Sequence, residues 1–521
     1  MRVFVPSFHG SFSLALLFLC LLFSTSSASP TPDDNYIPTD TDSKRLLKQA
    51  EKFLRDGRYP EAERALRRVT ELDSDNSLAK LRLAFALNKM RRLGEAYEIS
   101  FAIAKDEPDN AHAFAVLGTT LLNAGRFEDA RQVIFAAIQK DRREALAWAS
   151  YGLLEFYENN INESLLNLKE AAYYEPNEPD YVYALAQVSA RAERYRDAAD
   201  AYEKFLTVSR DTDSDRRERI RGLVRFLKYL GAKQVLYKMS GGDTEKLDFE
   251  LVGNRPILTV RVNDRDEPLR FVLDTGSGIT VISEDTAERL KIKSVARGGY
   301  ARGIGGNGQF EIVYGFLKNV SMGEVKISNV PIYIRHFHNN VNRVDGYIGL
   351  SLISKFLTTV DYGNRTFALE KKKNAGETID DSGIHIPLRL TSSGFLSGHV
   401  QLPGVELPLN FIVDTGASIS VISDELARLE PVNSFERGEP LRVIGAGGIT
   451  EAVPSVTLPK ISFGEHSRND IEAIALDLDL INEVAGFEQA GILGGNFLRN
   501  YRMTFDFSNS VVSFSPIDAA P

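Results

Sequence analysis

The chain has 521 residues, of which 43% are hydrophobic and 26% are charged, and its formal net charge is −9. At about 150 residues per domain, this length predicts three or four domains. The composition excludes a wholly disordered chain, a collagen-like chain and a membrane protein with many spans. The negative net charge gives no electrostatic basis for nucleic-acid binding.

Residues 1–28 have the pattern of a secretory signal peptide. Arg2 precedes an apolar stretch from Leu14 to Phe23, and small residues at 26–28 offer a cleavage site. The stretch is shorter than the ~20 residues that a membrane helix needs, although an uncleaved anchor is the alternative. We therefore expect a secreted or periplasmic protein with no stable membrane span after cleavage, and a disordered leader over 29–42.

The single cysteine, Cys20, lies within that apolar stretch and would leave with the signal. The exported chain would then have no disulfide, no thiolate metal site and no catalytic cysteine. We expect no cofactor and no bound metal. His336 and His338 alternate on a strand-like segment, but without cysteine or a paired acid motif nearby they are better interpreted as a surface pair than as a zinc site.

A 34-residue period runs through residues 43–212, which show helical periodicity. A bulky apolar residue stands three positions before each of five small residues at this period: Ala62, Ala96, Ala130, Ser164 and Ala198. The small residue lets paired helices approach closely, and the bulky one fills the gap beside it. The period and these positions resemble the tetratricopeptide repeat, with about five units.

Such a helical solenoid implies a concave surface that binds a protein partner or a substrate. A passive spacer or a dimerisation arm is the alternative, because solenoid curvature alone identifies no ligand. Residues 213–248 are expected to form an amphipathic capping helix and a linker.

A duplicated segment marks the second half of the chain, where short β-branched runs and turns predict an all-β fold. Residues 271–283 read FVLDTGSGITVIS, and residues 411–423 read FIVDTGASISVIS. An apolar-apolar-Gly element recurs later in each copy, at 347–349 and 492–494. Each copy also has a glycine-rich turn, with Gly303, Gly305 and Gly306 in the first and Gly445, Gly447 and Gly448 in the second. The copies span 249–371 and 383–516, and a linker over 372–382 joins them.

These doubled motifs resemble the aspartic proteases, closest to the retroviral or retropepsin-like type but with both halves in one chain. The resemblance implies a multidomain protein in which an all-α solenoid is followed by an all-β, pepsin/retropepsin-like protease with pseudo-twofold symmetry. Asp274 and Asp414 would meet at the axis, share one proton and activate a water for peptide hydrolysis. A pair of ordinary strand-end turns is the alternative interpretation of the doubled Asp-Thr-Gly.

The resemblance also assigns supporting roles to the neighbouring residues. Thr275 and Thr415 would interlock the two loops, and Gly276 and Gly416 would permit their tight backbone. The two glycine-rich turns would be flaps that close over an extended polypeptide substrate, with ordinary hairpin turns as the alternative. Ser277 could hydrogen-bond the first carboxylate whereas Ala417 cannot, so we expect the two aspartates to differ electrostatically.

The sequence therefore predicts an exported aspartic endopeptidase with a helical-repeat arm that recruits a protein partner or substrate. The alternative is a non-catalytic peptide-binding protein or assembly scaffold that retains the protease fold. The linker over 372–382 is long enough for the two halves to pair within one chain, and we favour that over pairing between two chains.

Overall fold

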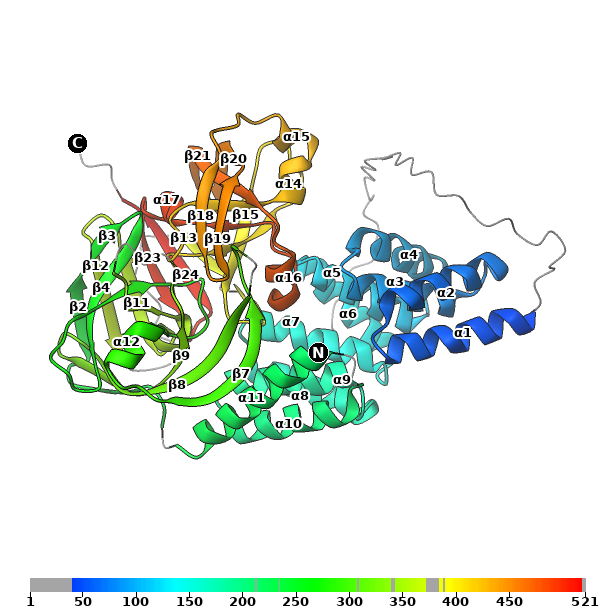
Figure 1. Ribbon diagram of the computed structural model, residues 1–521. Coiled ribbons are helices and arrows are strands. Elements are labelled where there is room, and N and C mark those ends of the chain that lie inside the picture. The colour runs from blue at the N-terminus through cyan, green and yellow to red at the C-terminus, as the bar shows by residue number, and fades with distance from the viewer. Residues whose placement is uncertain are drawn as a thin grey trace, which may run out of the picture.

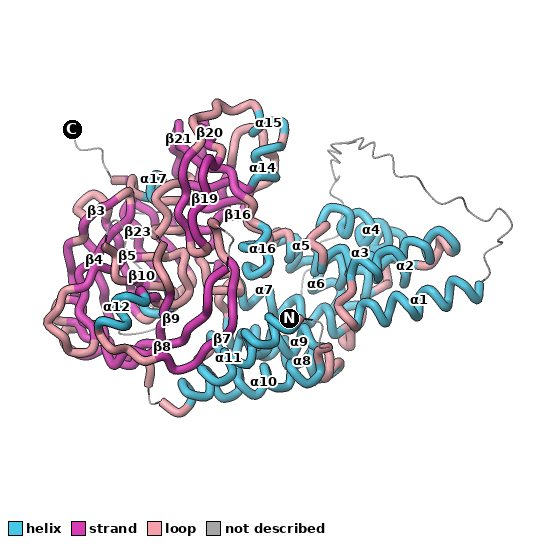
Figure 2. Tube along the Cα trace, viewed as in Figure 1, coloured by secondary structure: helices cyan, strands magenta, loops and turns pink. Residues whose placement is uncertain are grey.

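The computed structural model describes residues 40–210, 213–233, 235–306, 309–338, 343–371, 384–387 and 389–517. The predicted signal peptide, most of the predicted leader and the linker over 372–382 lie outside these residues. A helical region lies beside a β-rich region (Figure 1), and strands and long helices are almost completely segregated between the two (Figure 2). The predicted order of the two regions, an all-α region followed by a β-rich one, is thus observed.

The helical region is a row of helices in which each packs against the next. The small residues of the 34-residue period are completely buried, and the bulky residues before them begin every second helix. The helices are α1 (Asp40–Arg55), α2 (Tyr59–Leu72), α3 (Ser77–Lys89), α4 (Leu93–Asp106), α5 (Ala111–Asn123), α6 (Phe127–Lys140), α7 (Ala145–Tyr157), α8 (Ile161–Tyr174), α9 (Pro179–Arg191), α10 (Tyr195–Val208) and α11 (Ser214–Gly231).

Two glycines show how closely the paired helices approach. A Cβ atom on Gly118 of α5 would lie 2.5 Å from Cγ1 of Ile134 on α6, and one on Gly152 of α7 would lie 2.7 Å from Cγ of Leu168 on α8. A side chain at either position would push the helices apart, so the period reflects tight apolar packing between helix pairs.

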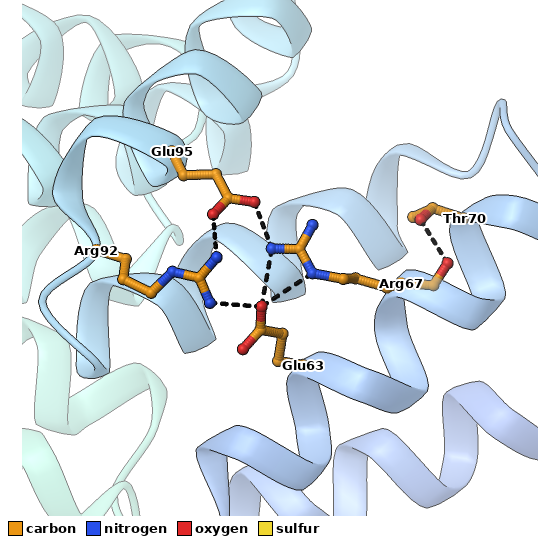
Figure 3. Close-up of polar contacts among 5 residues, drawn as sticks. All are labelled: Glu63, Arg67, Thr70, Arg92 and Glu95. Carbon is orange, nitrogen blue, oxygen red and sulfur yellow. Dashed lines mark hydrogen bonds and ion pairs between the residues drawn. The ribbon is translucent and has the colours of Figure 1, made fainter. Parts of the chain in front are cut away.

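Charged residues join neighbouring repeats at the surface (Figure 3). Arg67 of α2 pairs with Glu63 at 2.8 Å and with Glu95 of α4, while Arg92 pairs with Glu63 at 2.6 Å and with Glu95. Exposed ion pairs of this kind contribute about 0–1 kcal/mol each. The buried apolar contacts therefore stabilise the stack more than this network does.

The first β half is built on a nine-stranded sheet with the order β1-β9-β6-β10-β5-β4-β8-β7, in which β3 also pairs with β4. Its strands are β1 (Lys238–Ser240), β3 (Glu250–Val252), β4 (Arg255–Val262), β5 (Leu269–Leu273), β6 (Val281–Ser283), β7 (Ser294–Arg302), β8 (Gln309–Met322), β9 (Val325–Arg335) and β10 (Gly346–Ile348). The short helices α12 (Glu284–Arg289) and α13 (Leu350–Ile353) follow β6 and β10.

The second β half repeats this plan in a seven-stranded sheet with the order β14-β15-β16-β22-β17-β21-β20. Its strands are β14 (Arg389–Leu390), β15 (Leu396–Gln401), β16 (Leu409–Val413), β17 (Ser420–Ser423), β20 (Ser455–Phe463), β21 (His466–Leu476) and β22 (Gly491–Leu493), and β18 (Leu441–Gly445) and β19 (Gly448–Val453) form a separate hairpin. The short helices are α14 (Asp424–Arg428), α15 (Glu430–Asn433), α16 (Asp479–Ala485) and α17 (Gly495–Leu498).

The two halves share one local topology around the duplicated motif. In the first half β10 lies parallel to β5 and antiparallel to β6, and β6 lies parallel to β9. In the second half β22 lies parallel to β16 and antiparallel to β17, and β17 lies parallel to β21. Residues 140 positions apart in the two motifs therefore occupy equivalent places.

A six-stranded sheet joins the halves, with the order β13-β24-β23-β11-β12-β2. Its strands are β2 (Thr244–Asp248), β11 (Phe356–Asp361), β12 (Thr366–Lys371), β13 (Ile384–Pro387), β23 (Tyr501–Asp506) and β24 (Val511–Pro516). Because β11 of the first half pairs with β23 of the second, the halves pair within one chain.

Two strands lie in the segment 213–248, for which the sequence suggests only a capping helix and a linker. β1 pairs with β9, and β2 pairs with β12 at the edge of the six-stranded sheet. β2 has the sequence TEKLD, and its single apolar residue gives no alternating pattern that would predict a strand. The β region therefore begins earlier than residue 249.

The helical region packs directly on the β region. The ring of Phe487 lies 4.9 Å from that of Phe127 and 5.0 Å from that of Tyr157. Arg191 of α9 donates hydrogen bonds to the carbonyls of Thr391 at 2.6 Å and Ser392 at 3.1 Å. Aromatic packing and half-buried hydrogen bonds both cross this boundary, so the two regions are fixed against each other.

Helix α11 makes a second contact, with the hairpin formed by β7 and β8 (Figure 1). The rings of Phe226 and Tyr314 stack with their centroids 4.5 Å apart. Gly222 allows the backbones to touch, because a Cβ atom there would lie 2.3 Å from the carbonyl oxygen of Arg297. Arg225 donates to that same carbonyl at 2.8 Å.

Candidate active site

The two strands that carry the duplicated motif end side by side at their aspartates. Asp274 follows β5 and Asp414 follows β16. The N–H of Asp274 donates to the carbonyl of Ile348 at 3.0 Å, and the N–H of Asp414 donates to that of Leu493 at 3.0 Å. The apolar-apolar-Gly elements thus hold both loops in the same way.

Thr275 and Thr415 are completely buried and bond across the two loops. Each threonine N–H donates to the hydroxyl of the other, at 3.1 Å from Thr275 and 3.0 Å from Thr415. The hydroxyl of Thr275 donates to the carbonyl of Val413 at 2.6 Å, and that of Thr415 donates to the carbonyl of Leu273 at 2.7 Å. Four hydrogen bonds between the halves therefore lie directly beneath the aspartates.

Gly276 and Gly416 each face the aspartate of the opposite loop. A Cβ atom on Gly276 would lie 2.3 Å from Cγ of Asp414, and one on Gly416 would lie 2.6 Å from Oδ1 of Asp274. Neither glycine has a positive φ angle. Glycine is needed at both positions because the facing carboxyl group occupies the space of a side chain.

The side chains of Asp274 and Asp414 are half-buried and lie within hydrogen-bonding reach of each other. Burial, followed by the negative charge of Asp414, raises the pKa of Asp274 well above its ordinary value. Burial also raises the pKa of Asp414, but hydrogen bonds from Asp274 and from backbone N–H groups oppose this rise. The pKa of both carboxyl groups is therefore raised, and that of Asp274 more strongly.

The backbone explains why the two carboxyl groups differ. Oδ1 of Asp414 accepts the N–H of Gly416 at 2.7 Å and that of Ala417 at 3.2 Å, and both bonds stabilise its charged form. The hydroxyl of Ser277 instead donates to the carbonyl of Ile279 at 2.7 Å. Ser277 could have donated to the first carboxylate, but its hydroxyl closes a turn two residues further along its own loop.

The two glycine-rich turns contact each other. We call β7, β8 and their turn the first flap hairpin, and β18, β19 and their turn the second flap hairpin. The N–H of Gly447 donates to the carbonyl of Ile304 at 2.8 Å, and a Cβ atom on Gly305 would lie 2.3 Å from the carbonyl oxygen of Gly448. The structure thus brings the tips of the two hairpins together.

The remaining predicted turn residues lie in the same contact. A Cβ atom on Gly303 would lie 3.0 Å from that of Ala446, and one on Gly445 would lie 2.2 Å from the carbonyl oxygen of Ile304. The N–H of Gly306 donates to the hydroxyl of Thr450 at 3.1 Å. Main chain packs on main chain here, which only glycine-rich sequences allow.

Sequence reasoning missed Arg335, which ends β9 and lies near Asp274. Its positive charge acts to lower the pKa of Asp274. Its guanidinium lies 5.4 Å from the ring centre of Phe310 in the first flap hairpin and 5.6 Å from that of Phe337. The parallel pairing of β6 and β9 brings Arg335 close to Asp274, and no short sequence motif predicts that pairing.

Neither a metal site nor a membrane helix is evident in the described part of the chain. No group of three or more histidine, cysteine, aspartate or glutamate side chains among the described residues is placed to hold a metal ion. The His336 and His338 rings lie 5.0 Å apart. No helix within the described ranges has the length and apolar character needed to cross a bilayer.

Comparisons with known proteins agree with this architecture. Residues 258–352 and 399–497 match the aspartyl protease family, and residues 53–115 match the tetratricopeptide repeat. No curated protein matches the chain.

Solved structures resemble the two regions separately. A tetratricopeptide protein from Thermus thermophilus is 22% identical over 35% of this chain and 98% of its own, with a TM-score of 0.31. An aspartic proteinase from Irpex lacteus is 13% identical over 53% of this chain and 98% of its own, with a TM-score of 0.36.

The fold and the family matches define the class of this protein. It carries an aspartyl protease region formed by two sequence segments, preceded by tetratricopeptide repeats. The resemblance expected from the doubled Asp-Thr-Gly motif and the 34-residue period is confirmed.

Proposed function

We propose that the protein is an exported aspartic endopeptidase whose catalytic pair is Asp274 and Asp414. The observation that carries the proposal is that two half-buried carboxyl groups from equivalent loops lie within hydrogen-bonding reach of each other. Two carboxyl groups this close cannot both be ionised easily, and such a pair can act as acid and base in one reaction. The family match makes a peptide bond the natural substrate.

The hydrogen bonds of the two aspartates support a different proposed role for each. Asp414 has the better stabilised charge and acts as the base that takes a proton from a water molecule attacking the peptide carbonyl. Asp274 holds the shared proton and donates it to the carbonyl oxygen as negative charge develops there. The proton taken from water then passes to the leaving nitrogen, which breaks the C–N bond.

The flap hairpins and the repeats would serve the same reaction. The glycine-rich tips, which contact each other here, would part to admit an extended peptide, hydrogen-bond its main chain and exclude water from it. The solenoid would bring a protein substrate or partner to the protease region. The signal pattern in residues 1–28 supports a secreted or periplasmic location.

The test is cleavage of denatured casein by the purified protein from acid to neutral pH, with and without a statine-type transition-state mimic. We expect cleavage that the mimic inhibits and that Asp274→Asn or Asp414→Asn abolishes. Asp424→Asn is the matched control, because Asp424 lies on the surface and pairs only locally with Arg428.

Two results would contradict the proposal. Cleavage that survives both aspartate substitutions would exclude the carboxyl pair as the catalyst. A folded protein that binds peptides without cleaving them would instead be a peptide-binding scaffold. Export is tested separately by N-terminal sequencing of protein recovered outside the cytoplasm, where the mature chain should begin near residue 29.

A further inference from the structure

A positive charge flanks the aspartate pair on one side only. Arg335 is the last residue of β9 and pairs in register with Ser283 of β6. The corresponding pair in the second half joins Ser423 of β17 to Leu476 of β21. Because Ser283 and Ser423 are equivalent, Arg335 occupies the position that leucine holds in the second half.

The surroundings of Arg335 are also more polar than those of Leu476. Arg255 and Tyr347 lie near Arg335 on the same face of the first sheet, close enough for both arginines to act on the tyrosine hydroxyl. The register places Phe395 and Ile492 at the equivalent positions of the second sheet. One half thus presents two guanidinium groups and a phenol where the other presents apolar side chains.

The apolar face of the second half is continuous with the flaps. It forms one cluster with Ile304 of the first glycine-rich turn and Leu441 and Val443 of the second flap hairpin. In the first half, the guanidinium of Arg335 takes the corresponding place beneath Phe310 of the first flap hairpin. A peptide held between the flaps and the aspartates would therefore meet charge on one side and hydrocarbon on the other.

Arg335 has unused hydrogen-bonding capacity. Its Nε is buried and has no acceptor among the described residues, and the same is true of Nε of Arg255. A buried guanidinium N–H without a partner costs free energy that an arriving acceptor recovers. A carboxylate suits it best, because the planar guanidinium can bind both carboxylate oxygens at once.

We propose that Arg335 binds a carboxylate of the peptide substrate beside the scissile bond and that the second half takes a large apolar residue. This specificity rests on the proposed peptidase function and deepens it. The carboxylate could belong to a glutamate or aspartate side chain or to the C-terminus of a short peptide. Both sources present the same group to Arg335, and the experiment separates them.

The experiment starts from a peptide that the wild-type protein cleaves internally. Versions with Glu or Gln at each residue flanking the cleaved bond are synthesised with an amidated C-terminus, and kcat/KM is measured for each pair. A second set carries neutral side chains and differs only in a free or amidated C-terminus. A charge-assisted bond worth ~1.5–3 kcal/mol predicts a preference of about 10- to 100-fold for the carboxylate in one of the two sets.

The variant Arg335→Gln should reduce that ratio to about one. The ratio is the informative quantity because removing the charge also alters the pKa of Asp274, which affects both peptides of a pair equally. Arg502→Gln is the matched control, since it removes one exposed arginine of the joining sheet and should leave the ratio as in the wild type.

The outcomes distinguish this inference from the function it rests on. Cleavage by the wild type with a ratio near one in both sets overturns the role of Arg335, even if Arg335→Gln does not fold. A preference that survives in Arg335→Gln overturns it as well. Absence of any cleavage of casein or peptide contradicts the peptidase function itself.

Discussion

Replacing Thr275 with valine tests whether the interlocked threonines hold the two halves together. The change removes the hydroxyl that accepts the N–H of Thr415 at 3.0 Å and donates to the carbonyl of Val413 at 2.6 Å. Valine has nearly the same volume, so the surrounding packing stays the same. Each of the two freed backbone groups is buried and costs about 1–3 kcal/mol, which gives a total loss of about 2–6 kcal/mol.

Thermal unfolding and hydrogen exchange measure this loss. A loss of ~2 kcal/mol lowers the melting temperature of a region this size by roughly 4 °C or more. Exchange should rise most in peptides that cover β5 and β16, because these strands lead into the two loops. Casein cleavage should fall as well, since the loops carry the aspartates.

Thr275→Ser is the matched control because it keeps the hydroxyl and removes only a methyl group. We expect it to retain most of the stability and activity that valine loses. If the valine variant melts and exchanges like the serine variant, the interlocking hydrogen bonds do not stabilise the site and the reasoning fails.

Three further changes test other parts of the structure. Gly118→Ala should destabilise the solenoid by about 1–3 kcal/mol through overpacking against Ile134. Gly94→Ala is the control: no atom lies within 4 Å of the added Cβ, so it should stabilise the solenoid by about 0.5–1 kcal/mol. Equal effects of the two changes in circular-dichroism melts would contradict the close approach of α5 and α6. Phe487→Ala should cost about 3–5 kcal/mol and speed limited proteolysis between the regions, and unchanged proteolysis would show that this contact does not hold them together. Burial, followed by the charge of Arg389, lowers the pKa of His399 from 6.5 to about 4. The stability that neutral His399 contributes above pH 6.5 should therefore be lost as the pH falls through 4. Thermal melts of His399→Gln should lack this loss, and the same dependence of melting temperature on pH in both proteins would refute the prediction.

The sequence predicted the parts of the fold that repeat. The 34-residue period located the helix pairs because burial of Ala62 and its equivalents is a local packing requirement repeated in each unit. The doubled motif located Asp274 and Asp414 because both loops need the same residues at the same spacing. Repetition turned weak local signals into a specific prediction.

Features that depend on long-range pairing were not predictable in this way. Arg335 comes 61 residues after Asp274 in the chain, and only the β6–β9 pairing brings them together. The strand β2 has too few apolar residues to show a pattern. The sequence allowed Ser277 to donate to Asp274 and did not reveal that its hydroxyl faces the carbonyl of Ile279.

The contact between α11 and β7 makes the two flap hairpins mechanically unequal. The first is backed by a helix, through the stacked rings of Phe226 and Tyr314 and the bond from Arg225 to the β7 backbone. The second is a hairpin whose strands β18 and β19 pair only with each other. To swing open, the first hairpin must break its contacts with α11 or carry that helix along. The repeat arm therefore braces the first flap hairpin directly, whereas the second is held by its tip contact with the first and by the apolar contacts of Leu441 and Val443 within its own half.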